Sequence, residues 1–272
     1  MWSNLLYVSN LAAGLENALD DPKFLLDAIA PFNGSVGLEL FLHYNSESYK
    51  AHMESIAQWL GDIPRTMHGP FRQVEATSEA GSDGQKYLFD AYRWGFEQAK
   101  KLGVKEMVFH THQRVILPHE KESAQKCCID NLNQLITMGH LYGVTLLVEN
   151  LGIQLEGVSL FDEQEFIELI EQTPQVECLI DTGHLNVAGW DTEHVLQKLS
   201  KRIKGYHLHN NDGILDSHQP IQAGTYDYDR FFVLYKKYTP NVPLTLEYAD
   251  GIAVTPSLLV RDLEWTMRKL RA

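Results

Sequence analysis

Short apolar runs recur along this chain, and each is followed by a stretch with the spacing of an amphipathic helix. The runs fall at residues 5–10, 35–43, 65–70, 106–112, 144–150, 177–184, 203–212 and 244–250. Helices are predicted over 85–103 and 121–143, both of which end in glycine as helix C-caps often do, and a last helix over 257–270. Strands that alternate with helices indicate a parallel sheet.

Eight such repeats favour a closed (β/α)₈ barrel, the TIM barrel of α/β proteins, because barrels of this kind need roughly 250 residues. The chain has 272 residues and no Pro/Gly-rich linker, so one domain over 1–272 is expected. A doubly wound open sheet is the alternative. That fold usually has a glycine-rich phosphate loop after its first strand, and here SNLAAGLENA (9–18) has one glycine.

Net charge and cysteine content limit the partners and the compartment. The formal net charge of −13 disfavours nucleic acid and anionic membranes as partners, because an acidic surface repels both. No apolar run approaches the ~18 residues needed to span a bilayer, and MWSNLLYVSN lacks the basic region of a secretory signal. Cys127, Cys128 and Cys178 form no C-x-x-C pair, which predicts buried, reduced thiols in a cytoplasmic protein.

Polar residues gather where the predicted strands end. In the second run Glu39 and His43 share the face opposite Val36, Leu38, Leu40 and Leu42, so they are expected to point into the barrel. The residues at strand ends or in the following turns are His43, His68, His110, His112, Glu149, Asp181, His184, His207, His209 and Glu247. Any one of them could be a structural side chain, and Asp181 could cap a helix. Together they would be costly to bury unpaired, and imidazoles and carboxylates suit a divalent metal.

Two histidine pairs with period two leave the ligand choice open. His207 and His209 share one strand face, as do His110 and His112. Proximity to the barrel rim favours His209, with His207 a layer deeper, but it does not decide between His110 and His112. Glu149 and Glu247 end the fifth and eighth strands, so they could exchange a proton with opposite faces of a substrate carbon.

Four motifs carry a resemblance to a known superfamily. They are VEN (148–150), LIDTGHLNVAGWD (179–191), HLHNND (207–212) and LEY (246–248). In this order they resemble the xylose isomerase-like TIM barrels, which include sugar isomerases, epimerases and the endonuclease IV type of nuclease. The resemblance implies one divalent metal held by Glu149, Asp181, His209 and Glu247.

The endonuclease IV branch is similar at further positions. It implies additional ligands at His68, His110, His184, Asp216 and His218, hence up to three zinc ions, and it favours His110 over His112. The chain departs from that branch at Gln222 and Ala223, where the family usually has Gly and Glu. The first two loops, NLAAGLENALDD and HYNSESYKAH, also lack basic character, which counts against cleavage of DNA.

The leading functional hypothesis is a divalent-metal-dependent isomerase or epimerase of a sugar or related hydroxy-ketone, using Mn²⁺, Mg²⁺, Co²⁺ or Zn²⁺. Glu149 and Glu247 would transfer protons through a metal-stabilised ene-diolate, and His184 would bond a substrate hydroxyl. Arg72 and Arg114 could hold an anionic end of the substrate. The alternative is a phosphoester hydrolase with two or three zinc ions. The third is a metal-binding barrel with lyase, dehydratase or non-catalytic function.

The sequence leaves the quaternary structure open. Trp190, Tyr226 and Tyr228 lie near the predicted rim, where they could shape a pocket or a contact between subunits of a homo-oligomer.

Overall fold

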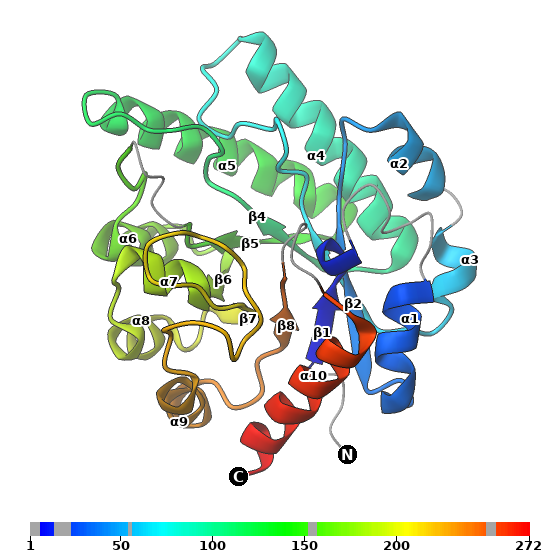
Figure 1. Ribbon diagram of the computed structural model, residues 1–272. Helices are drawn as coiled ribbons and strands as arrows, with labels where there is room; N and C mark the ends of the chain where they lie inside the picture. Colours follow the sequence, from blue (N-terminus) through cyan, green and yellow to red (C-terminus); the bar gives the residue numbers. More distant parts are fainter. Residues whose placement is uncertain (1–5, 14–22, 54–55, 152–156, 249–253) are drawn as a thin grey trace.

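A computed structural model describes residues 6–13, 23–53, 56–151, 157–248 and 254–272. Its parallel strands close into a barrel in the order β1 to β8 (Figure 1). The strands are β1 (Leu6–Ser9), β2 (Val36–Phe41), β3 (Arg65–His68), β4 (Glu106–Phe109), β5 (Thr145–Glu149), β6 (Glu177–Asp181), β7 (Ile203–Leu208) and β8 (Leu244–Leu246). The predicted TIM barrel is confirmed. The open-sheet alternative is wrong, because β1 pairs with β8 through Leu6 and Leu244.

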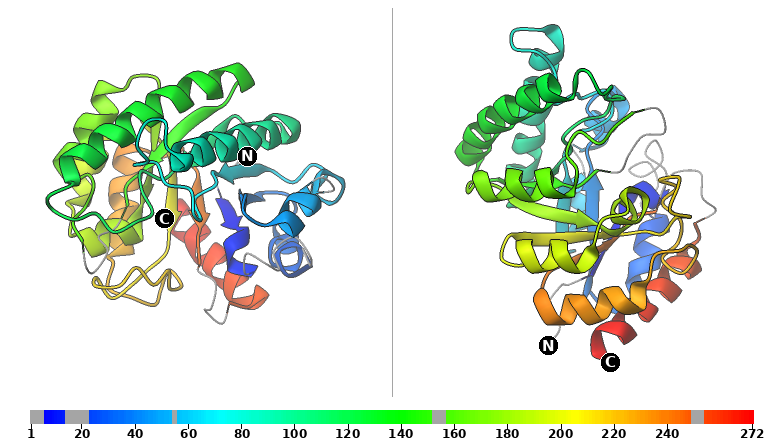
Figure 2. Two further views of the ribbon diagram at one scale, coloured as in Figure 1. Left: turned by 90° about the horizontal axis from the view of Figure 1, so that it is seen from above. Right: turned by 90° about the vertical axis from the view of Figure 1, so that its left-hand side faces the viewer.

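Helices surround the strands, as both views of Figure 2 show. The α-helices are α1 (Lys23–Ile29), α2 (Glu47–Met53), α3 (Ile56–Leu60), α4 (Asp83–Leu102), α5 (Lys121–Tyr142), α6 (Glu163–Gln172), α7 (Thr182–Ala188), α8 (Thr192–Leu199), α9 (Tyr228–Tyr238) and α10 (Pro256–Arg271). Two short 3-10 helices, Asn10–Ala13 and Ala30–Phe32, complete the described elements.

Capping residues mark the start of α4 and the C-terminal ends of both long helices, α4 and α5. The side chain of Ser82 accepts a hydrogen bond from the Gln85 N–H and so caps the N-terminus of α4. Gly103 and Gly143 end α4 and α5 with φ of 73° each, in the left-handed region that glycine adopts without steric cost. Their predicted C-cap roles are confirmed.

The strands separate an apolar layer outside the barrel from a polar interior. Leu38 and Leu40 of β2 are fully buried in the core between strands and helices. On the other face Glu39 is 2% exposed, and its Oε1 lies 2.9 Å from Nε2 of His207, across the barrel. The predicted inward direction of Glu39 is therefore confirmed.

The strands are shorter than the sequence runs, because several polar residues lie in the turns that follow. After β6 the chain turns directly into α7, and a second short helix, α8, precedes β7. The segment between β7 and α9 returns over α7 (Figure 1), where Asn186 Nδ2 donates to Asn211 Oδ1 at 2.7 Å. The same segment brings Asp216 and His218 beside His184 and His209.

The structure also tests the predictions about membrane-spanning helices and about burial of the three cysteines. Among the described helices, none combines the length and apolarity required to cross a bilayer. Cys128 and Cys178 are buried as expected, but Cys127 is only partly buried, so that part of the prediction is wrong. Cys128 faces the barrel side of α5, and its neighbour in the helix turns away from the core. The cytoplasmic location stays a prediction.

Candidate metal centre

Ligand-type side chains meet at the C-terminal ends of the strands in three neighbouring groups, each with donor atoms within 4.8 Å of one another. The central group is Glu149, Asp181, His207 and Glu247. The second is His68, His110 and Glu149, and the third is His184, His209, Asp216 and His218. Glu149 joins the central and second groups. The third group lies against the central one, because His209 Nε2 is 3.0 Å from Asp181 Oδ1 and His218 Nδ1 is 3.5 Å from Glu247 Oε2, so the three form one continuous polar site.

The central group is enclosed by β5 to β8. His207 Nδ1 lies 3.3 Å from Glu149 Oε1 and 3.3 Å from Glu247 Oε2, between the two carboxylates. Burial raises the pKa of Glu149, but the charges of His110 and His207 outweigh burial and hold it well below its usual value. For Glu247 burial dominates and raises the pKa to about 7. The two carboxylates thus differ in their tendency to hold a proton.

The second group joins β3, β4 and β5. His110 Nε2 lies 2.8 Å from Glu149 Oε2 and 2.9 Å from His68 Nε2. His68 Nδ1 is 2.8 Å from the carbonyl oxygen of Gly69, so this nitrogen donates its proton there and Nε2 faces the group with its lone pair. Nitrogens this close to a shared carboxylate suit a bound cation.

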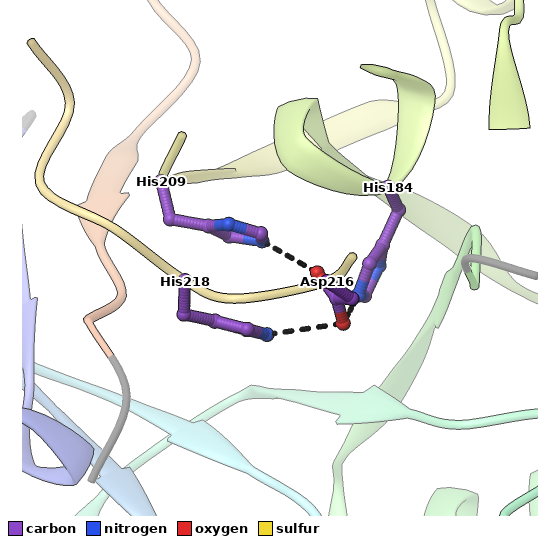
Figure 3. A group of neighbouring side chains, drawn as sticks. All are labelled: His184, His209, Asp216 and His218. Carbon is purple, nitrogen blue, oxygen red and sulfur yellow. Dashed lines mark hydrogen bonds and ion pairs between the residues drawn. The ribbon is translucent and has the colours of Figure 1, made fainter. Parts of the chain in front are cut away.

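In the third group Asp216 lies among three imidazoles (Figure 3). Its Oδ2 is 3.0 Å from His184 Nε2 and 3.3 Å from His218 Nε2, and its Oδ1 is 3.7 Å from His209 Nε2. Burial lowers the pKa of His218, but the hydrogen bond and charge of Asp216 outweigh burial and raise it to about 9. His184 Nδ1 lies 2.8 Å from the Asn150 carbonyl, which directs Nε2 toward Asp216.

The turn after β6 explains the spacing of the D-T-G-H segment. Asp181 Oδ1 accepts the backbone N–H of His184 at 2.7 Å and so caps α7, the role that the sequence left open. The same oxygen lies 3.0 Å from His209 Nε2. Gly183 leaves room for the His209 ring, because a Cβ at this position would lie 2.0 Å from its Cε1. Capping and a ligand role are therefore compatible at Asp181.

Buried atoms without hydrogen bonds test whether a metal fits. Glu149 Oε2, Asp181 Oδ2 and His209 Nε2 are buried and make no hydrogen bond of normal geometry within the described residues. Such groups cost free energy when left unsatisfied. A divalent cation would satisfy them, since carboxylate oxygens and imidazole nitrogens are its ordinary ligands. The residues present therefore fit a metal.

All nine residues predicted as ligands lie in these groups. The predicted primary set is divided, because His209 falls in the third group while His207 joins Glu149, Asp181 and Glu247. His112 is buried and belongs to none of the groups among the described residues; its Nδ1 lies 3.2 Å from Thr111 Oγ1. Which atoms hold metal stays a prediction.

Sequence reasoning assigned no role to Asn150 or Gly183. Asn150 Oδ1 accepts the Asp181 N–H at 2.8 Å and its Nδ2 donates to the Asp181 carbonyl at 3.1 Å, which ties the ends of β5 and β6 together. Its position next to Glu149 was the available signal. Tyr228 is buried and donates to the His209 carbonyl at 2.8 Å, so it supports the chain just after β7.

Two relatives in sequence are informative. Inosose isomerase from Bacillus subtilis is 26% identical over 132 residues, 47% of this chain and 46% of that protein. "Probable endonuclease 4" from Acholeplasma laidlawii is 28% identical over 163 residues, 54% of this chain and 55% of that protein. The chain spans about half to two thirds of the length of the curated relatives it matches.

Solved structures share the fold over nearly the whole chain. A D-tagatose 3-epimerase-like protein has a TM-score of 0.77 at 16% identity, covering 98% of this chain and 97% of that one. The IOLI protein with a binding zinc atom has a TM-score of 0.75 at 18% identity, covering 97% of each chain. The sequence model described as "Xylose isomerase-like TIM barrel" matches residues 26–269. The chain belongs to the xylose isomerase-like TIM-barrel family.

Proposed function

We propose that this protein is a divalent-metal-dependent isomerase or epimerase of a sugar or related hydroxy-ketone. The observation that carries the proposal is the pair Glu149 and Glu247, which are buried at the ends of β5 and β8 with His207 Nδ1 3.3 Å from each. Two carboxylates converging from different strands suit removal of a proton from a substrate carbon and its return elsewhere. The names of the relatives, inosose isomerase and D-tagatose 3-epimerase-like protein, agree with this chemistry.

Glu149, Asp181, Glu247 and His209 would hold the metal, with His207 as the other candidate for the imidazole position. A divalent cation bound there polarises neighbouring substrate oxygens and so acidifies the adjacent C–H bond. Glu149 and Glu247, on either side of His207 Nδ1, would act as the base that accepts the proton and the acid that supplies one. His184 would hydrogen-bond a substrate hydroxyl only if the hydroxyl displaces Asp216 from Nε2, because Nδ1 is held by the Asn150 carbonyl.

Exchange of substrate protons with solvent tests this function. Protein purified without chelator is analysed for metal by mass spectrometry and then incubated with ketoses in deuterated water, with deuterium incorporation followed by NMR. E149Q and E247Q should each lower the exchange rate by about 10²-fold or more, because each removes a proton-transfer group. The matched control is E264Q, since Glu264 is exposed on α10. Exchange that survives both site substitutions would refute the proposal.

A second candidate is a phosphoester hydrolase with two or three zinc ions. The observation that favours it is the third group, in which Asp216 lies among His184, His209 and His218 and which adds ligands beyond the central group. Neighbouring metals can activate water and stabilise both oxygens of a displacement. Two or three zinc ions per chain, with hydrolysis of bis-p-nitrophenyl phosphate, would support this candidate. Metal binding with neither activity would leave lyase, dehydratase or binding functions.

A further inference from the structure

A cavity of about 850 Å³ lies beside the metal groups, lined by the segments that follow β2, β3 and β4. It is large enough for a ligand bigger than a single small ion, within the range of small-molecule sites. The arginines that the sequence singled out, Arg72 and Arg114, both line it. The structure thus brings two residues 42 positions apart to one cavity.

The cavity wall touches the second metal group. Gln113 lines the cavity, and its amide nitrogen lies 2.7 Å from His110 Nδ1. Phe71, next to Arg72, packs its ring 5.2 Å from that of His110 and 5.4 Å from that of His68. Gln113 and Phe71 would therefore separate a ligand in the cavity from His110 and His68 of the candidate metal centre.

The lining carries a positive balance in an acidic protein. The lining contains two arginines, Arg72 and Arg114, and one carboxylate, Glu75, whereas the whole chain has a net charge of −13. Both oxygens of Glu75 are already engaged. Oε1 accepts from the N–H and Oγ1 of Thr77, and Oε2 accepts from the backbone N–H groups of Gln113 and Arg114, at 2.7–2.9 Å. The Glu75 carboxylate therefore joins the segment after β3 to the segment after β4, and its hydrogen bonds go to backbone N–H groups and a hydroxyl, not to an arginine side chain.

The two arginines differ in what already holds them. Arg114 Nε donates to Thr77 Oγ1 at 3.0 Å, and its Nη1 pairs with the Glu120 carboxylate. Arg72 is exposed to the cavity and makes no hydrogen bond or ion pair with the described residues. A guanidinium with all its donors available binds planar or tetrahedral oxyanions in bidentate fashion. Arg72 is therefore the arginine available to bind an anion, and Arg114 forms part of the fixed wall of the cavity.

We propose that this cavity binds an anionic group of the substrate, a phosphate or a carboxylate, through Arg72. The hydroxy-ketone end of the same molecule then extends past Gln113 to the metal groups. This inference rests on the proposed function for the identity of the reacting end. The substrate class it names is a phosphorylated or carboxylated sugar or polyol.

Binding measurements separate this inference from the activity. Titration calorimetry on the intact protein would compare D-fructose 6-phosphate, D-glucuronate, inorganic phosphate and neutral D-fructose, for wild type, R72Q, R72K and R268Q. R268Q makes the same charge change at an exposed residue near the end of α10. R72Q should weaken at least one of the anionic probes about tenfold or more and leave D-fructose unchanged, because a charge-assisted hydrogen bond is lost. R72K should recover part of that affinity, and R268Q should match wild type.

The pattern over the probes identifies the source of the anion. Tighter binding of D-fructose 6-phosphate points to a phosphorylated substrate, and tighter binding of D-glucuronate points to a carboxylated one. Equal effects of R72Q and R268Q, or no anionic probe that depends on Arg72, would overturn the inference. If Arg72-dependent binding occurs while no proton exchange is found, the anion site stands and the proposed function fails.

Discussion

Replacing Gly183 with alanine tests the packing that positions His209. The new Cβ would lie 2.0 Å from Cε1 and 2.3 Å from Nδ1 of the His209 ring. Optimal carbon contacts are near 3.5 Å, so the ring or the backbone must move by roughly 1.5 Å. The ring is fully buried and stacks on His218 at a centroid distance of 3.7 Å, so it has little space into which it can move.

Two opposing effects determine how G183A changes the folding stability. Gly183 lies in the first turn of α7, where alanine is favoured over glycine by at most about 1 kcal/mol. Overpacking in a buried site costs about 1–3 kcal/mol, which offsets or exceeds that gain. Metal binding is the more sensitive property, because ligand distances tolerate only about 0.2 Å. We expect G183A to lower zinc affinity by at least about tenfold, comparable with the loss of a supporting group around a metal.

The assay is zinc titration by calorimetry together with urea unfolding, with and without zinc. G95A is the matched control, since Gly95 also lies inside a helix, α4. Its Cβ would meet the Leu42 Cδ1 methyl at 3.1 Å, which needs a shift of a few tenths of an ångström, and Met107 Cε and Pro70 Cδ at 3.4 Å, which is an ordinary contact. We therefore expect G95A to bind zinc as wild type does.

A double-mutant cycle decides whether the contact with His209 is responsible. In an H209A background the imidazole is gone, so G183A should become neutral or stabilising by up to about 1 kcal/mol. Equal destabilisation by G183A with and without the His209 ring would refute the steric reasoning.

Three further predictions concern charge and burial. In the metal-free protein the His218 pKa is raised from 6.5 to about 9, so the stabilisation by protonated His218 is present below pH 6.5 and is lost as the pH rises through 9. Thermal unfolding measured against pH should show this loss of stability, and H218Q should flatten the profile. Zinc binding at pH 7.5 should release protons, measured by calorimetry in buffers of different ionisation enthalpy. Asp262 is fully buried and accepts from Tyr248 OH and Gln222 Nε2 at 2.9 Å, so D262A should cost about 2–4 kcal/mol in urea unfolding, against little change for D62A at an exposed site. Burial raises the pKa of the Cys128 and Cys178 thiols, so iodoacetamide should label Cys127 in the folded protein and the other two only after unfolding, as peptide mass spectrometry would show.

The barrel was predictable because its signals are local and repeat. The faces of β2 follow from period-two spacing, and the ends of α4 and α5 follow from Gly103 and Gly143. The short helices after β6 were not predicted as elements, although Asp181 was considered as a helix cap. Asp181 and Asp191 each cap a helix of only about two turns, while the apolar pattern needed to recognise a helix requires a longer window.

The sequence predicted which residues converge at the site, but not how they divide among the three groups. Strand ends of a parallel barrel share one rim, so His68, Glu149, Asp181 and Glu247 had to converge. Whether His207 or His209 lies beside the carboxylates depends on the tilt and register of β7, and β6 and β7 shift register between Cys178 and Leu179. A shift of this kind leaves no signal in the residues of β7 itself, so sequence spacing could not resolve the choice.

The double membership of Glu149 determines which substitution separates the two functional candidates. Removing Glu149 disturbs both the central and the second group, so E149Q would impair a one-metal isomerase and a multi-zinc hydrolase alike. His68 belongs only to the second group, with its Nε2 3.5 Å from Glu149 Oε2. If one metal in the central group suffices, H68Q should keep proton exchange within a few fold of wild type. If the activity needs neighbouring metals, H68Q should lower both the zinc content per chain and the rate of phosphoester hydrolysis. Loss of proton exchange in H68Q, with metal content unchanged, would contradict a reaction confined to the central group.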